Sequence, residues 1–401
     1  MTGSKSLEDS IDSLVAMMKD VGLENVRTED VTVPDWERGY EAAELLLPRR
    51  YSMNILGLGT SVGTPPGGLV ADAVVVESFD EFDGLRAEKV KGKIVVFVPQ
   101  FDSYSKTTIY RQRAASVASK KGALAVLVRS LTSLSIGSPH TGSQKYVEGV
   151  KKIPAASITV EDAEMLLRMY HRGETIRIHL ELEDRNLGPT VSRNTIAELE
   201  GRTDGPVVVL SGHIDSWDVG AGALDDGGGS FISWKAIEFL KKLNLRPRRT
   251  IRSILWTAEE QGSLGSKAYH DRYRARDRHT FNFFFESDSG TFDPKGMGFK
   301  GNAEAECIFK EILKLMTPLN ATEFVSELPG APDLVHWVNR GFPAASPLHY
   351  NRTEYFWFHH TAGDSMLVMS SRDLDKNTAL FAAASFVIAD LSVDMPKEVS
   401  D

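Results

Sequence analysis

The sequence predicts an α/β fold with a mixed, mainly parallel sheet flanked by helices. Apolar runs of strand length alternate with segments whose apolar residues recur every three or four positions. Three of these runs, Val207–Leu210, Ile251–Trp256 and Phe281–Phe285, are followed closely by histidine or acidic residues. Runs that are apolar throughout are typical of parallel strands covered on both faces. We therefore expect one buried sheet whose strand ends carry the functional side chains.

Length and composition limit the possible classes of protein. A chain of 401 residues is long enough for about two domains. Its 42% of hydrophobic and 25% of charged residues are typical of a globular protein. The net charge of −9 argues against nucleic acid and against an anionic membrane surface as partners. No apolar run reaches the roughly 18 residues that a membrane-spanning helix requires, so we expect no such segment.

The N-terminal residues 1–60 are predicted to open the main domain. Apolar residues recur at helical spacing over Ser6–Val21, which predicts a helix on the outside of the sheet. Val26–Val33 is predicted to be a strand that Pro34 breaks. Two further strands are expected at Glu41–Leu47 and Met53–Leu58.

A second domain is predicted at residues 61–190, because the pattern changes after Gly59. A proline- and glycine-rich loop at Thr64–Gly68 precedes a new series of strands and helices. No cluster of metal-binding residue types occurs in it. The expected strands are Val70–Val76, Lys91–Phe97, Gly122–Val128, Ile153–Thr159 and Thr175–Leu182, and the expected helices are Arg111–Lys121 and Glu161–Arg172.

Residues 191–401 are predicted to complete the main domain, beginning with a strand at Asn194–Leu199. A helix is expected at Ser230–Leu243, with Ser230 as its N-cap. Further helices are expected at Ser266–Arg276, Ala303–Met316, Pro332–Asn339 and Leu374–Leu391, and a strand at Gly341–Leu348.

The polar residues that follow the three apolar runs suit a divalent metal. In open parallel sheets, ligands bind beyond the carboxyl ends of the strands, so these residues should meet at one edge. Carboxylate-rich ligation with few histidines is typical of two metals about 3.5–4 Å apart, because an anionic group bridges them. The residues concerned are His213, Asp215, Glu259, Glu260, Glu286 and Asp288.

The bridge and a second histidine are available elsewhere in the chain. Asp225-Asp226 lies among glycines that permit a tight backbone path close to the metals. His359 or His360 supplies the second imidazole, with Asp364 nearby to restrain the loop. Each piece alone has an ordinary explanation, such as a turn before a helix. Their occurrence together, in this order, favours the metal site.

Five motifs resemble those of the co-catalytic di-zinc exopeptidases of the aminopeptidase/glutamate carboxypeptidase family. They are His-x-Asp, Gly-Ala-x-Asp-Asp-Gly, Glu-Glu-x-Gly-x-x-Gly, Glu-Ser-Asp and His-Thr-x-x-Asp, and the resemblance extends over nearly the whole chain. It implies the zinc exopeptidase fold, with a protease-associated domain inserted at 61–190 between catalytic parts at 1–60 and 191–401. It also implies that the inserted domain serves as a lid and dimer surface rather than in the chemistry, and that the protein is a homodimer.

Position by position, the resemblance implies two zinc ions per chain and a role for each motif residue. Glu259 corresponds to the general base, and Asp215 to the partner that orients a histidine ligand. His360 is preferred over His359 because His360-Thr361-Ala362-Gly363-Asp364 has the spacing of the family. The implied ligands are His213 and Asp288 for one zinc, Glu260 and His360 for the other, and Asp225 as the bridge.

The expected activity is that of a carboxypeptidase or dipeptidase acting on dipeptides or short peptides with free termini. A zinc-bridging water activated by Glu259 would attack the scissile carbonyl. An aminopeptidase with the same metal site is an alternative, and the inserted domain and the motif match over the whole chain argue against it. A non-catalytic binding homologue is another alternative, and the complete set of ligand residues argues against that.

Other expectations concern the compartment and the substrate pocket. The resemblance implies a secreted or lysosomal protein, and two glycosylation sequons, at Asn320 and Asn351, fit that route. The N-terminus has no signal-peptide pattern, so we expect the chain to lack an N-terminal extension, with a cytoplasmic form as the alternative. The single cysteine, Cys307, permits no intrachain disulfide. Side chains that could reach the substrate are Tyr104, Tyr110, Arg111, Arg113, His140, Tyr146, Tyr350 and Tyr355.

Overall fold

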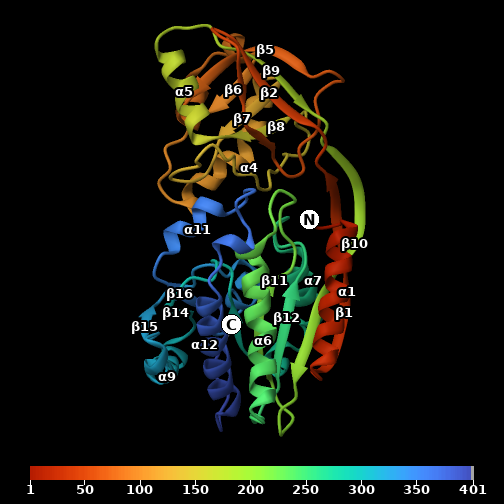
Figure 1. Cartoon of the computed structure of the whole chain (residues 1–401), viewed down its shortest axis with the longest axis vertical. Coiled ribbons are helices and arrows are strands. Elements are labelled where there is room, and N and C mark those ends of the chain that lie inside the picture. The colour runs from red at the N-terminus through yellow and green to blue at the C-terminus, as the bar shows by residue number, and fades with distance from the viewer. Residues whose placement is uncertain (399–401) are drawn as a thin grey trace.

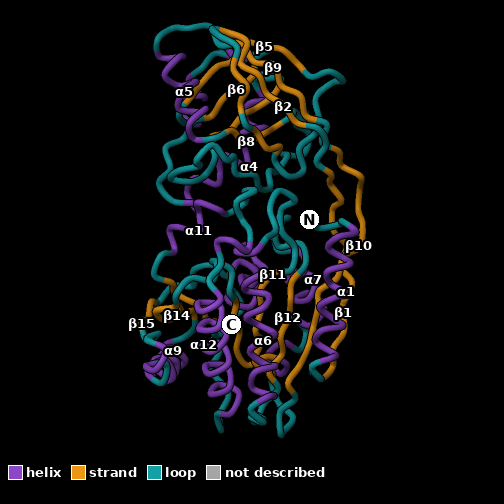
Figure 2. Tube along the Cα trace, in the orientation of Figure 1, coloured by secondary structure: helices purple, strands orange, loops and turns teal. Residues whose placement is uncertain are grey.

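The computed structural model describes residues 1–398 and contains two mixed sheets, one above the other (Figure 1). The lower sheet has the strand order β1-β10-β12-β11-β13-β16-β14-β15, and the upper sheet β3-β2-β9-β5-β6-β7-β8-β4. Both sheets are flanked by helices (Figure 2). The predicted α/β class, with a mixed sheet and a second domain, is confirmed.

The centre of the lower sheet is parallel, as predicted. β11 pairs in parallel with β12 and with β13, and β13 pairs in parallel with β16. Antiparallel pairs join β1 to β10, β10 to β12 and β14 to β16. The strands are β1 (Glu24–Glu37), β10 (Arg185–Leu199), β11 (Val207–His213), β12 (Ile251–Trp256), β13 (Phe281–Glu286), β14 (Pro294–Lys300), β15 (Glu323–Val325) and β16 (Ala344–His349).

Helices bury both faces of the lower sheet, because alternate residues of its central strands point to opposite sides. Val208 and Leu210 join the larger core with α1, α6, α9 and α12, while Val209 packs with α7 and α10 on the other face. Figure 1 shows α6 and α12 running alongside each other. The helices outside the upper domain are α1 (Lys5–Asp20), α6 (Gly228–Lys242), α7 (Leu264–Tyr273), α8 (Asp277–Thr280), α9 (Ala303–Lys314), α10 (Val335–Val338), α11 (Arg352–Phe358) and α12 (Ser371–Asp390).

The upper sheet begins earlier in the chain than the predicted domain boundary at residue 61. The strands expected in the first part of the main domain pair instead within the upper sheet, since β2 pairs with β9 and β4 with β8. The chain changes sheets between Glu37 and Glu41 and returns between Leu182 and Arg185. The upper elements are β2 (Glu41–Leu47), β3 (Tyr51–Met53), β4 (Ile55–Gly57), β5 (Leu69–Val76), α2 (Phe79–Gly84), α3 (Ala87–Val90), β6 (Ile94–Phe97), α4 (Tyr104–Lys120), β7 (Ala125–Arg129), β8 (Ala155–Ile158), α5 (Val160–His171) and β9 (Arg177–Leu182).

The predicted break at Pro34 is wrong. β1 continues through it to Glu37, and Pro34 lies opposite Pro189 of β10. Proline removes a ladder donor, which an edge strand tolerates, and β1 is the edge of the lower sheet. The long β1–β10 pair thereby connects the two domains, as Figure 1 shows.

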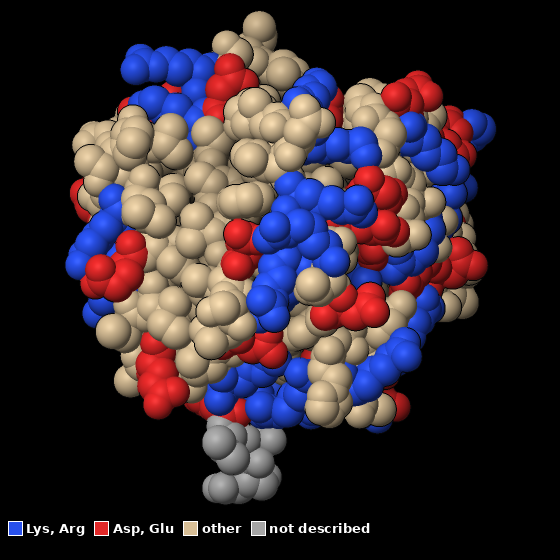
Figure 3. All heavy atoms as spheres, turned by 90° about the horizontal axis from the view of Figure 1, so that it is seen from below, with Lys and Arg blue, Asp and Glu red and all other residues tan. Residues whose placement is uncertain are grey.

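The surface does not gather charge of one sign at the lower end of the molecule. Seen from below, lysine and arginine side chains lie beside aspartate and glutamate (Figure 3). Among the helices of residues 1–398, none combines the length and the apolar character needed to cross a bilayer.

Candidate metal centre

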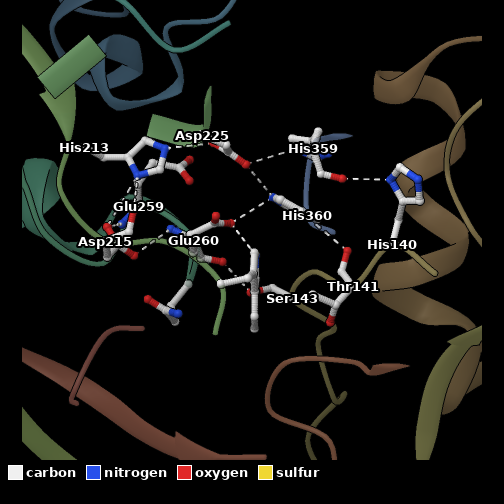
Figure 4. Close-up of polar contacts among 12 residues, drawn as sticks. His140, Thr141, Ser143, His213, Asp215, Asp225, Glu259, Glu260, His359 and His360 are labelled. Carbon is white, nitrogen blue, oxygen red and sulfur yellow. Dashed lines mark hydrogen bonds and ion pairs between the residues drawn. The ribbon is translucent and has the colours of Figure 1, made fainter. Parts of the chain in front are cut away.

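The predicted ligand residues come together above the carboxyl ends of the central strands (Figure 4). His213 is the last residue of β11, Glu259 and Glu260 follow β12, and Asp288 follows β13. These strands are parallel neighbours, so their ends lie at the same edge. The convergence that the sequence predicted is therefore present.

A first group of candidate ligands consists of His213, Asp225 and Asp288. The Nε2 atom of His213 lies 3.2 Å from Oδ1 of Asp225 and 3.7 Å from Oδ1 of Asp288. One ligand atom from each residue lies within 4.8 Å of the others, a spacing that can hold one ion. His213 and Asp225 are buried, and Asp288 is nearly so.

A second group lies on the other side of Asp225. Its Oδ2 atom is 3.1 Å from Nε2 of His360, and that nitrogen is 3.0 Å from Oε2 of Glu260. Asp225 thus presents Oδ1 to one group and Oδ2 to the other. This is the arrangement of a carboxylate that bridges two ions.

His359 is also placed to be a ligand here, because one ligand atom each from Asp225, His359 and His360 lies within 4.8 Å of the others. Its Nε2 atom is 3.5 Å from Oδ2 of Asp225, and its ring stacks on that of His360 with centroids 3.5 Å apart. His360 has the additional contact with Glu260 and also donates from Nδ1 to the carbonyl of Thr141 at 3.0 Å. That hydrogen bond leaves Nε2 as the ligating atom. The preference for His360 stays a prediction.

Asp215 orients His213, but its contact differs from the expected carboxylate pair. Nδ1 of His213 donates to the backbone carbonyl of Asp215 at 2.9 Å, while the carboxylate lies 3.6 Å away. The carboxylate instead accepts from the backbone amides of Glu259 and Glu260, at 3.0 and 3.3 Å, and from the hydroxyl of Thr2 at 2.8 Å. Asp215 therefore fixes the loop that carries both glutamates as well as the histidine ring.

Asp364 fixes the bridging residue. Its carboxylate accepts from the backbone amides of Leu224 and Asp225, at 2.7 and 3.1 Å. The predicted role of Asp364 was to restrain the His360 loop. The hydrogen bonds add that it joins this loop to the segment that carries Asp225.

Close packing explains the glycines after Asp225. A Cβ atom on Gly229 would lie 1.9 Å from the carbonyl oxygen of Ser287, so only glycine fits there. α6 begins at Gly228, and Ser230 is not its N-cap as predicted. The Ser230 hydroxyl donates instead to the carbonyl of His213 at 2.7 Å, which holds the helix start against the end of β11.

The site holds carboxylates whose pKa values are shifted in opposite directions. Burial raises the pKa of Glu259 well above its ordinary value, and the negative charges of Asp288 and Asp333 act in the same direction. Burial also opposes ionisation of Asp225, but the neighbouring His359, His213 and His360 together hold its pKa well below the usual range. Asp225 is therefore suited to bind a cation, and Glu259 to accept a proton.

The donor set fits divalent metal ions. Oδ2 of Asp225 and Oε1 of Glu260 are buried and have no hydrogen-bond partner within residues 1–398. A buried carboxylate oxygen without a partner is costly, and a bound cation would satisfy it. Imidazole nitrogens with carboxylate oxygens are ligands that zinc accepts.

Sequence reasoning missed the contribution of the upper domain to this site. The Nδ1 atom of His140 donates to the carbonyl of His359 at 2.7 Å, Thr141 accepts from His360, and the Ser143 hydroxyl donates to the carbonyl of Glu260 (Figure 4). The sequence indicates His140 only as a residue that could reach substrate. A histidine in the glycine- and serine-rich segment 137–143 was the available signal.

Trp217 was missed as well. Its Nε1 atom donates to Oε2 of Glu260 at 2.5 Å, and its ring meets that of Trp36 edge to face, with centroids 6.3 Å apart. Trp217 lies two residues after the His-x-Asp motif, which placed it near the site but gave no indication of its partner.

A cavity of about 860 Å³ lies beside the candidate ligands, between the two domains. Asp225, Glu259, Glu260, Asp288, His359 and His360 line it. Of the side chains expected to reach substrate, Tyr104 and Arg111 of the upper domain and Tyr355 of α11 line this cavity. Tyr110, Arg113, His140, Tyr146 and Tyr350 do not.

Comparison with known proteins agrees with this fold. The profile of Peptidase family M28 matches residues 194–385, and that of the PA domain matches residues 65–166. The chain belongs to Peptidase family M28 and is a peptidase with an inserted PA domain. It is 48% identical to carboxypeptidase Q of Mus musculus and 46% identical to that of Homo sapiens, each over 99% of this chain and 84% of the relative.

Solved structures share the whole architecture. The crystal structure of a Peptidase M28 precursor from Shewanella amazonensis SB2B superimposes with a TM-score of 0.94 at 32% identity, over 100% of this chain and 92% of that one. BSAP, a zinc aminopeptidase from Bacillus subtilis, gives a TM-score of 0.73 at 20% identity, over 98% of this chain and 94% of that one. An aminopeptidase thus has the same two-domain fold, so the argument that the inserted domain disfavours an aminopeptidase is wrong.

Proposed function

We propose that this M28 peptidase is a zinc-dependent exopeptidase that binds two ions per chain and hydrolyses dipeptides or short peptides with free termini. The observation that carries the proposal is the position of Asp225, whose two carboxylate oxygens face two separate groups of candidate ligands. In this proposal, one ion is held by His213, Asp225 and Asp288, and the other by Asp225, Glu260 and His360.

Zinc bound here would polarise the scissile carbonyl and lower the pKa of a bound water. Glu259 lines the cavity directly before the ligand Glu260 and is the candidate general base. It would take the proton of the attacking water and pass it to the leaving amine.

Substitution of Glu259 by glutamine tests the proposed mechanism. The change keeps size and polarity but removes the base, so kcat should fall by at least about 100-fold while zinc content is unchanged. Zinc would be measured by elemental analysis and turnover on an unblocked dipeptide. Loss of zinc together with the activity would show that Glu259 is a ligand and would contradict its role as the base.

The carboxypeptidase reading is supported by the similarity to carboxypeptidase Q over nearly the whole chain. Probable leucine aminopeptidase 2 of Aspergillus fumigatus is 26% identical over 85% of the chain, which keeps the aminopeptidase alternative. Hydrolysis of one dipeptide blocked at either its amino or its carboxyl end decides between them. A carboxypeptidase tolerates the block at the amino end.

A further inference from the structure

One arginine in the cavity has no anion to balance it. Arg352 is the first residue of α11, which lies between the two domains (Figure 1). Its Nε atom is buried and has no hydrogen-bond partner within residues 1–398. No carboxylate of those residues lies within 4.0 Å of its guanidinium nitrogens.

This environment is unfavourable for an arginine without a partner. Burial lowers the pKa of the Arg352 guanidinium, and the neighbouring Tyr355 and Asp288 only oppose that effect. Arg352 as a whole is partly buried, but a buried N–H such as its Nε–H normally has an acceptor, because removing a polar group from water is costly. An anion brought by a ligand would supply the missing partner.

The position of Arg352 places that anion beside the proposed reaction centre. Arg352 lines the same cavity as Glu259, Asp288 and His360. α11 also leads directly into His359 and His360, so the arginine and the metal-binding histidines share one short segment. A ligand in this cavity can therefore contact both Arg352 and the candidate metal ligands.

The other cations of this cavity are already partnered or exposed. Arg111 donates to the carbonyls of Thr141 and Ser143 and to the hydroxyl of Tyr104. Lys145 and Lys300 line the cavity but are exposed to solvent. Arg352 is thus the cation of the cavity best placed to bind a desolvated anion.

We propose that Arg352 binds the free carboxylate at the C-terminus of the peptide substrate. This inference rests on the proposed function and adds to it a residue that selects the substrate end. A guanidinium offers a fork of donors that matches the two oxygens of a carboxylate, which gives both affinity and direction. A peptide bound in this way presents its last peptide bond to the metal centre.

The test compares kcat/KM for a dipeptide and for its C-terminal amide in four proteins with measured zinc content. The wild type should prefer the free acid by about 10- to 100-fold, as expected for a charge-assisted hydrogen bond. In Arg352→Gln, kcat/KM for the free acid should fall by that factor while kcat/KM for the amide stays the same. The ratio of the two values therefore falls toward one. Arg352→Lys should retain part of the preference. Lys300→Gln, an exposed cation of the same cavity, should keep the wild-type ratio.

Several results would overturn the assignment. An unchanged ratio in Arg352→Gln, or an equal fall in Lys300→Gln, would show that Arg352 is not a specific site. If Arg352→Gln changes only the preference for a C-terminal glutamate over glutamine, the arginine binds a side-chain carboxylate instead. Amide hydrolysis in Arg352→Gln shows that this variant is folded. If the zinc-loaded wild type cleaves neither peptide, the proposed function itself fails, and this is seen in the wild type alone.

Discussion

Asp225 offers its two carboxylate oxygens to two different histidines. Oδ1 lies 3.2 Å from His213 and Oδ2 lies 3.1 Å from His360. Removing Asp225 should therefore weaken both proposed zinc sites, whereas removing either histidine should weaken one. Metal content therefore distinguishes the shared residue Asp225 from the two histidines.

We expect Asp225→Ala to bind less than about one zinc per chain, and His213→Ala and His360→Ala each to keep about one. Elemental analysis of the gel-filtered proteins at equal zinc supply measures this. Retention of two ions by Asp225→Ala would contradict the bridging role.

The burial of His349 should make the folded protein less stable on mild acidification. The Nε2 atom of His349 pairs with Oδ1 of Asn377 at 3.0 Å, and its Nδ1 atom is buried with no hydrogen-bond partner among the described residues 1–398. The charges that act on it are those of Arg352 and Asp293. Burial lowers its pKa to about 4. As the pH falls below about 6.5, the unfolded chain binds a proton that the folded chain refuses, so stability decreases from there down to about pH 4.

The expected loss attributable to His349 is about 2 kcal/mol between pH 7.5 and pH 5. Urea unfolding of the wild type and of His349→Gln at both pH values measures it, and the variant should lose less stability. Equal losses in the two proteins would refute the role of His349.

At the scale of single residues, the sequence predicted which candidate ligands come together but not which residues they contact. His213, Glu260 and Asp288 were predictable as candidates because each lies at or just beyond the end of an apolar strand. Trp217 and Thr141 were not, because their contacts with Glu260 and His360 depend on how distant segments approach each other. Distant segments also decide how Asp215 contacts His213. The backbone amides of Glu259 and Glu260 bind the carboxylate of Asp215, and its backbone carbonyl accepts from His213 instead.

Among the elements, the segment 137–143 connects the upper domain to the candidate metal centre. Arg111 of α4 holds it by donating to the carbonyls of Thr141 and Ser143, at 3.2 and 3.3 Å. Gly142, between them, has a φ of 140°, and a Cβ atom there would lie 2.3 Å from the Arg111 guanidinium. The hydrogen bond from His360 to Thr141 depends on this arrangement.

Gly142→Ala should displace Arg111 and the segment, and should lower kcat/KM by about 10-fold. The matched control is Gly137→Ala in the same segment, whose φ is also positive, at 70°, but whose Cβ atom would meet nothing within 4 Å. Steady-state kinetics of both variants measures the effect. A similar loss in both would mean that backbone strain, rather than the contact with Arg111, is responsible.

The element predictions were most accurate where local pattern decides structure. Ile251–Trp256 forms β12 with the predicted bounds, because its apolar run is covered on both faces. Pro34 did not end β1, since an edge strand tolerates proline. The pairing of Glu41–Leu47 with β9 of the upper sheet could not be inferred, because strand partners far apart in sequence leave no local signal.

For the whole molecule, the two domains enclose one cavity to which both contribute side chains. The PA domain match at 65–166 and the Peptidase family M28 match at 194–385 correspond to these two parts. The upper domain is more than a cover, because it also orients His360 through Thr141. The homodimer and the secretory route stay predictions from the resemblance.

The most direct test of the central proposal is zinc content per chain, measured with hydrolysis of an unblocked dipeptide before and after chelation. We predict about two zinc ions per chain, loss of turnover on chelation and its return when zinc is restored. Turnover that survives complete removal of the metal would contradict the proposed mechanism. A folded chain that binds no zinc and cleaves no peptide would instead identify a non-catalytic member of the family.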